Sequence, residues 1–81
     1  MKVRVRLFAV ARELAGTEII EIEAPTGATV ADLRQLIASG HPALAPVLPQ
    51  ILMAVDSEYA AAGTVLKPGA DVACIPPVSG G

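Results

Sequence analysis

The chain has 81 residues, the length of a single domain, with a net charge of −2 and only six basic side chains, too few for a nucleic-acid-binding surface. No apolar run approaches the roughly 18 residues of a membrane span, and the amino end lacks the apolar segment of a signal peptide, so we expect a cytoplasmic protein that contacts no membrane. Hydrophobic residues make up 53% of the chain and charged residues 17%, so we expect apolar surface that a protein partner covers.

Two segments near the start alternate apolar and charged residues, as strands with one buried face do. The first covers residues 2–8, and the second covers residues 17–24 and stops at Pro25. Between them, residues 9–15 tolerate a helix but are too few for a free-standing one, so we predict a turn or a single helical turn closed by Gly16. The two strands are therefore expected to form a hairpin.

The outward-facing side chains of this hairpin carry opposite charges. Arg4 and Arg6 on the first strand can lie opposite two acidic residues of the second strand, Glu21 and Glu23. Cross-strand pairs of this kind contribute about 0.2–1 kcal/mol each. The same arginines could instead dock an acidic partner surface, and the sequence leaves both interpretations open.

One main helix is predicted over residues 30–39. Thr29 and Asp32 have the spacing of a capping box, apolar residues follow at helical intervals, and Gly40 provides a stop. A single helix that follows a hairpin must cover one face of the sheet.

Prolines punctuate the segment after this helix. Pro42, Pro46 and Pro49 predict an irregular loop that crosses the fold. His41 opens the loop, but no second histidine, cysteine or acidic cluster stands at metal-ligand spacing. We therefore predict no metal site and interpret His41 as a surface or helix-end residue.

The second half of the chain contains three short predicted strands, over residues 51–55, 59–61 and 72–75. A polar turn separates the first two, and residues 67–71 have the proline and glycine positions of a type II turn before the last. The order of elements predicts an α+β fold of the beta-grasp (ubiquitin-like) type, a mixed sheet with one main helix and with the last strand parallel to the first. The only cysteine, Cys74, excludes an internal disulfide and is expected to be a buried, inert thiol.

The last six residues form a separate unit, so we divide the chain into a domain over residues 1–75 and an extended tail over residues 76–81. Pro76 and Pro77 fix the backbone and remove two donors, and the tail can reach roughly 20 Å. Gly80 and Gly81 lack Cβ, so the terminal carboxylate can pass through a narrow channel. The residues expected to present it are Pro76, Pro77, Val78, Ser79 and Gly80. The other interpretation is a frayed end or an expression scar.

An apolar docking face is expected beside the tail. Phe8 ends the first strand, next to the last strand in the predicted sheet, so it can share a patch with Pro77 and Val78. The alternative is that Phe8, the only phenylalanine, belongs to the core.

Four stretches together resemble the small subunit of molybdopterin synthase, in the MoaD family of ubiquitin-like sulfur carriers. They are Leu7-Phe8-Ala9, Arg12-Glu13-Leu14-Ala15-Gly16, Leu66-Lys67-Pro68-Gly69 and Pro76-Pro77-Val78-Ser79-Gly80-Gly81. The chain departs from the commoner family pattern at Ala70-Asp71, where Asp-Glu is frequent, and at Cys74-Ile75, where aromatic residues are frequent. These departures concern packing and partner contact. The terminal Gly-Gly is present, so they do not affect the chemistry at Gly81.

The resemblance implies a cycle of chemistry at Gly81. A partner adenylating enzyme of the E1-like class uses ATP to activate the carboxylate, and a sulfur donor converts it to a thiocarboxylate. The large subunit of molybdopterin synthase, in a heterotetramer, then transfers this sulfur to build the dithiolene of molybdopterin, for molybdenum cofactor biosynthesis. The chain would act as the sulfur-donating subunit of a sulfurtransferase, with no bound cofactor and no catalytic side chains of its own.

Other functions share the same tail. The chain could carry sulfur for another product, such as thiamine or an amino acid, or be a ubiquitin-like modifier conjugated to lysines. It could also be a binding module without chemistry.

Overall fold

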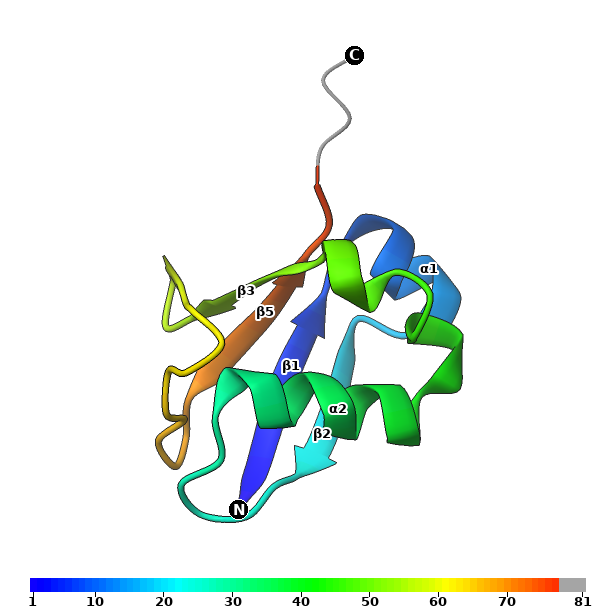
Figure 1. Ribbon diagram of the computed structural model, residues 1–81. Coiled ribbons are helices and arrows are strands. Elements are labelled where there is room, and N and C mark those ends of the chain that lie inside the picture. The colour runs from blue at the N-terminus through cyan, green and yellow to red at the C-terminus, as the bar shows by residue number, and fades with distance from the viewer. Residues whose placement is uncertain (78–81) are drawn as a thin grey trace.

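The computed structural model describes residues 1–77 (Figure 1). Its elements in chain order are β1 (Lys2–Leu7), α1 (Ala9–Ala15), β2 (Ile19–Glu23), α2 (Val30–Gly40), the 3-10 helices η1 (Pro42–Leu44) and η2 (Leu48–Gln50), β3 (Leu52–Val55), β4 (Glu58–Tyr59) and β5 (Asp71–Ile75).

The strands form one mixed sheet in the order β2-β1-β5-β3-β4. β1 pairs antiparallel with β2 and parallel with β5, while β3 pairs antiparallel with both β5 and β4. α2 crosses one face of this sheet (Figure 1). The predicted beta-grasp fold and the parallel pairing of first and last strands are confirmed.

The start of α2 is fixed by its own sequence. The Thr29 hydroxyl accepts a hydrogen bond from the Asp32 N–H at 3.2 Å, and the Asp32 carboxylate accepts one from the Thr29 N–H at 2.9 Å. This is the predicted capping box. Gly40 is the last residue of the helix and His41 is its C-cap, so His41 stands at a helix end as expected.

The core lies between α2 and the sheet. Alternate residues of β1 and β2 point into it, and every residue that is buried among residues 1–77 is apolar. The largest fully buried side chains are Leu33, Ile37, Leu44, Ile51, Met53, Leu66, Val5, Val30, Val72 and Cys74. Burying such side chains is the main source of folding free energy.

Two local predictions were wrong, and tertiary packing is the reason in both. Residues 9–15 form a seven-residue α-helix rather than at most one turn, because α1 packs against η1 and β5 with Ala11 fully buried. The loop after α2 contains two 3-10 helices where no regular structure was expected, because η1 packs against both α1 and α2 with Leu44 fully buried. Pro42 opens the first of them, a position that requires no N–H group.

The turns follow the predicted chemistry more closely than the strand ends do. Gly69 has φ 81° and the Ala70 N–H donates to the Lys67 carbonyl oxygen at 3.0 Å, as in the predicted type II turn. The strand predicted over residues 59–61 is instead β4, which starts one residue earlier and contains two residues.

The outward-facing charges pair only partly as expected. Arg4 does lie opposite Glu21, but Arg6 lies opposite Ile19 instead of Glu23. The Arg6 Nε atom donates to the Asp71 carboxylate at 3.1 Å, across the parallel β1–β5 pair. The hairpin register alone therefore did not identify the partner of Arg6.

Candidate functional site

Three strand ends meet where the tail leaves the domain. In the β1–β5 pair Leu7 is opposite Cys74, and in the β3–β5 pair Leu52 is opposite Ile75. The end of β1, the start of β3 and the end of β5 therefore lie at one edge of the sheet. Figure 1 shows the chain leaving at this edge, with α1 and the turn that precedes β3 at the same end.

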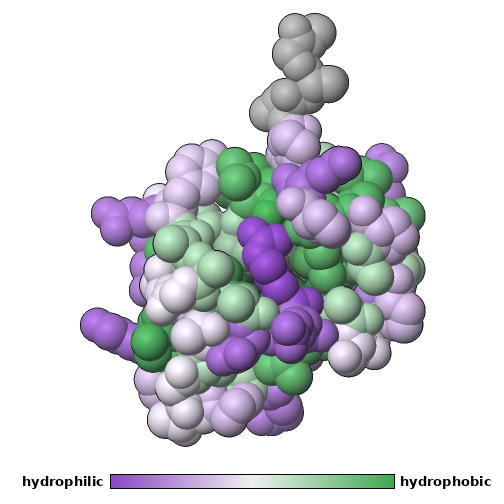
Figure 2. Space-filling view, viewed as in Figure 1, coloured by the Kyte–Doolittle hydropathy of each residue, from purple (hydrophilic) through white to green (hydrophobic). Residues whose placement is uncertain are grey.

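The tail can be followed through its two prolines. β5 ends at Ile75, Pro76 is half-buried, and Pro77 is exposed. Figure 2 shows hydrophobic patches on either side of the base of the tail, with hydrophilic side chains between them, on the side seen in Figure 1. The other residues assigned to tail presentation and chemistry, Val78, Ser79, Gly80 and Gly81, lie outside the described residues.

Phe8 is a surface residue and does not belong to the core. Its side chain is 46% exposed at the N-cap position of α1, with an extended backbone that continues β1. The alternative that Phe8 is the core's phenylalanine is therefore wrong. Its position at the tail edge fits the expected docking face, which stays a prediction.

A hollow of about 330 Å³ lies on the open face of the sheet, the face not covered by α2. The lining residues are Arg6, Phe8, Ala54, Ser57, Tyr59, Asp71, Ala73 and Ile75. Ala54 and Ala73 are direct partners in the β3–β5 pair, so two small side chains stand next to each other in the middle of this face. Phe8 and Tyr59, the chain's two aromatic residues, both line the hollow, and Tyr59 is 71% exposed. We call this the alanine hollow.

Cys74 is buried, as predicted. Its side chain is fully inaccessible, and its Sγ atom donates to the Met53 Sδ atom at 3.5 Å. Burial raises the pKa of the thiol to about 11, and the nearby Arg34 guanidinium opposes this rise only in part. A thiol in this environment holds its proton at neutral pH and is a poor nucleophile.

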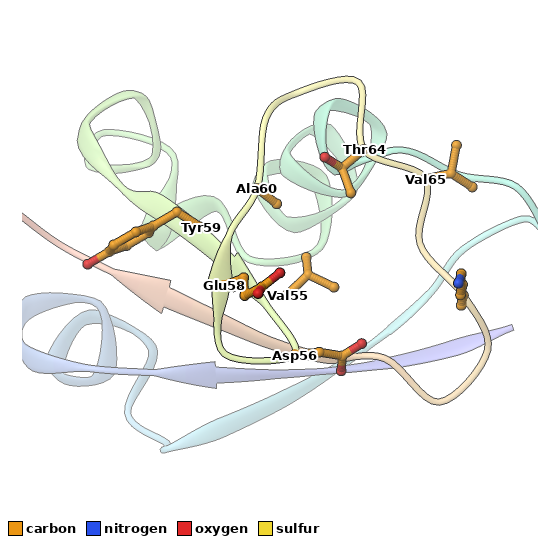
Figure 3. Close-up of a pocket in the computed structure, with 8 residues that line it drawn as sticks. Val55, Asp56, Glu58, Tyr59, Ala60, Thr64 and Val65 are labelled. Carbon is orange, nitrogen blue, oxygen red and sulfur yellow. The ribbon is translucent and has the colours of Figure 1, made fainter.

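A second depression, of about 270 Å³, lies at the other end of β3 (Figure 3). Asp56, Glu58 and Thr64 line it, while the ring of Tyr59 points away from Thr64 and Val65. Nothing in the sequence had suggested this hollow. Within residues 1–77, no three His, Cys, Asp or Glu side chains gather as a metal site would need. This second depression lies at the end of β3 away from the tail, so it is a poor candidate for chemistry at the chain's carboxyl end.

Sequence reasoning missed Arg34. Its two terminal nitrogens donate to the carbonyl oxygens of Leu48 and Ile51, at 2.7 and 2.6 Å. A signal was available, because Arg34 stands four residues after Val30 and three before Ile37, on the buried side of α2.

Comparison with known proteins then identifies the family. The model of the ThiS family matches residues 5–81. The chain belongs to the ThiS family. It is 40% identical over 83 residues to the molybdopterin synthase sulfur carrier subunit of Chlamydomonas reinhardtii, and the match covers 100% of both proteins.

Solved structures agree with this ThiS-family assignment. The crystal structure of SAMP1 from Haloferax volcanii superposes with a TM-score of 0.89 at 31% identity, covering 100% of both chains. One chain of a complex of subunits 1 and 2 of molybdopterin-converting factor from Helicobacter pylori superposes with a TM-score of 0.72 at 28% identity, again covering 100% of both chains. The resemblance to the small subunit of molybdopterin synthase is confirmed. Within residues 1–77, no helix has the length and apolar character needed to cross a membrane.

Proposed function

We propose that this chain is the sulfur carrier subunit of a molybdopterin synthase and that the carboxyl group of Gly81 carries the sulfur. The names of its relatives support this function. The structural observation that carries the proposal is the exit of the chain through Pro76 and Pro77, beside the exposed Phe8 and the alanine hollow. A partner that contacts this edge would find the terminal glycine within its reach.

The proposed chemistry has two steps before transfer. An E1-like adenylating enzyme uses ATP to form an acyl-adenylate at Gly81 with release of pyrophosphate, because a carboxylate is a poor electrophile without a leaving group. A donor that supplies sulfur at the oxidation level of sulfide then attacks the acyl-adenylate, which forms the C–S bond of a thiocarboxylate and releases AMP. The large subunit would transfer that sulfur to a pterin precursor, and water would restore the Gly81 carboxylate as its C–S bond breaks. Because a dithiolene contains two sulfur atoms, two carriers are used per dithiolene.

The chain's own side chains are poorly placed to act as acids or bases in this reaction. His41, the only histidine, stands at the end of α2, and Cys74 is buried with a raised thiol pKa. We therefore assign acid, base and oxyanion roles to the partners, and sulfurtransferase activity to the assembled synthase. The chain itself would bind no cofactor, since ATP belongs to the adenylating enzyme.

The partner surface is assigned to the tail edge and the open face. Phe8 and Tyr59 are exposed aromatic residues around one hollow, and aromatic side chains are enriched among the residues that dominate binding energy. Docking there would place Pro77 and Val78 at the border of the interface. The complex of subunits 1 and 2 from Helicobacter pylori supports a large-subunit partner, which we expect to form a heterotetramer in the cytoplasm.

A ubiquitin-like modifier is the second candidate. The similarity in sequence and in structure to small archaeal modifier protein 1 (SAMP1) of Haloferax volcanii favours it. A modifier would be found joined through Gly81 to lysines of other proteins, whereas a sulfur carrier would be found as the free thiocarboxylate.

Mass spectrometry of the native protein separates these candidates. We expect the intact chain to gain the mass difference between sulfur and oxygen after incubation with its adenylating enzyme, ATP and a sulfur donor. A chain without Gly81 is the matched control and should gain nothing. A chain that forms only lysine conjugates and no thiocarboxylate would contradict the sulfur-carrier proposal.

A further inference from the structure

Arg34 joins the helix layer to the loop that precedes β3. Among the side chains of residues 1–77, it is the only one that donates hydrogen bonds to two backbone carbonyl groups. Its Nη1 atom lies 2.7 Å from the Leu48 oxygen, its Nη2 atom lies 2.6 Å from the Ile51 oxygen, and both bonds are partly buried. Charge-assisted bonds in such surroundings are stronger than bonds between neutral groups in water.

These two carbonyls belong to the first residue of η2, Leu48, and to its C-cap, Ile51. Leu48 and Ile51 are 5% and 2% exposed, and the Ile51 N–H donates to the same Leu48 oxygen at 3.1 Å. Carbonyl groups in such a buried segment need hydrogen-bond partners. The planar guanidinium satisfies both at once with a fixed spacing, which a single ammonium group cannot reproduce.

The segment that Arg34 holds leads directly to the tail edge. Ile51 precedes Leu52, Leu52 is the β3 partner of Ile75, and Pro76 follows Ile75. Leu52 is itself 51% exposed, so it belongs to the surface beside the tail.

We infer that Arg34 is a positioning residue for partner docking, because it fixes η2 against α2 and thereby sets where β3 begins beside the base of the tail. Arg34 touches neither the tail nor the reacting carboxylate. Its loss shifts the surface around Leu52 and Ile75, which weakens the carrier's encounter with its enzymes. The chemistry at Gly81 proceeds once the complex has formed. This inference rests on the proposed function, since it concerns the enzymes that act on Gly81.

The first test compares Arg34→Lys with the unaltered chain as substrate of the adenylating enzyme. The lysine keeps the positive charge but loses the two-pronged contact. We expect the KM for the carrier to rise about tenfold, equivalent to about 1.4 kcal/mol, with kcat changed less than about twofold. Gln35→Ala, one residue along on the exposed side of α2, is the matched control and should leave both constants unchanged. A folded Arg34→Lys chain with an unchanged KM would overturn the inference.

A second variant changes η2 itself instead of Arg34. Pro49→Gly leaves Arg34 in place but loosens the backbone of η2, because glycine samples many more conformations than proline. We expect it to raise KM in the same direction. If Arg34→Lys does not fold, this variant decides, and a KM equal to that of the unaltered chain refutes the positioning role.

Backbone amide shifts of the free chain test the positioning step without any enzyme. In Arg34→Lys or Pro49→Gly, changes should extend from η2 through Leu52 to Ile75, and should be absent from the β1–β2 hairpin. Changes that stop at Ile51 would refute the inference even if the unaltered chain proves to carry no sulfur. Failure of the unaltered chain to accept sulfur would instead refute the proposed function, so the two failures are distinguishable.

Discussion

The two faces of the sheet are built from the same alternating strands but have opposite compositions. The face under α2 is closed and apolar, with Val5 and Val72 fully buried as neighbours in the β1–β5 pair. The open face carries charged residues around Arg4, while small and aromatic residues surround the alanine hollow, which the Arg6–Asp71 ion pair also lines. The comparison shows that stability is concentrated on one face, while the residues available to a partner are on the other.

The largest expected effect is the loss of the reacting group itself. A chain that lacks Gly81 should show no adenylation or sulfur uptake, because the carboxylate of Ser79-Gly80 would stop short of the partner's catalytic groups. Its melting temperature should match that of the unaltered chain, since Cys74 is the last buried residue among residues 1–77. A large drop in thermal stability would show that the tail contributes to the fold, contrary to its presentation role.

A substitution on the covered face should act on stability alone. Leu33 is fully buried in α2, so Leu33→Ala should lower the free energy of unfolding by about 3 kcal/mol through lost burial and a cavity. Urea denaturation measures this change. The fraction that remains folded should bind the large subunit as the unaltered chain does, and weaker binding by that fraction would break the division between the two faces.

A substitution on the open face should do the opposite. Phe8→Ala should weaken binding of the large subunit about tenfold while lowering the free energy of unfolding by less than about 1 kcal/mol, because the ring is 46% exposed. Calorimetric titration and urea denaturation give the two numbers. Val78→Asp tests the tail side of the same interface, and normal binding by both variants would rule this docking face out.

Cys74→Ser should have the smallest effect on the carrier. The serine variant should accept sulfur at Gly81 as the unaltered chain does, since the buried thiol takes no part in the proposed transfer. A variant that folds but accepts no sulfur would favour a relay through Cys74.

The same variant tests how the stability of the fold depends on pH. The folded chain raises the pKa of the Cys74 thiol from 9.0 to about 11, so it holds this proton more tightly than the unfolded chain does. The stability linked to the protonated thiol is present below about pH 9 and is lost as the pH rises through about 11. Urea denaturation at several pH values should show that loss in the unaltered chain and not in Cys74→Ser. A parallel decline in both proteins would argue against a raised thiol pKa.

Local sequence determined most of the elements. Alternation of side chains is a property of a few neighbouring residues, and it gave β1, β2 and the inward isoleucines of the hairpin. The Thr29–Asp32 capping box and the type II turn at Gly69 depend on contacts within four residues, so the sequence alone predicted both of them. The order of elements suggested the beta-grasp fold and the parallel pairing of β1 with β5, and the family resemblance supported that prediction.

Contacts between distant residues decided the rest. The length of α1 depends on packing against η1 and β5. Phe8 is exposed because other apolar side chains occupy the core. Arg6 pairs with Asp71, 65 positions away, rather than with the expected Glu23. Helical spacing puts Arg34 on the buried side of α2, but its acceptors are carbonyls 14 and 17 positions on, which no short-range pattern contains. Each of these outcomes is set by which segments the tertiary fold brings together, so only the three-dimensional structure could reveal it.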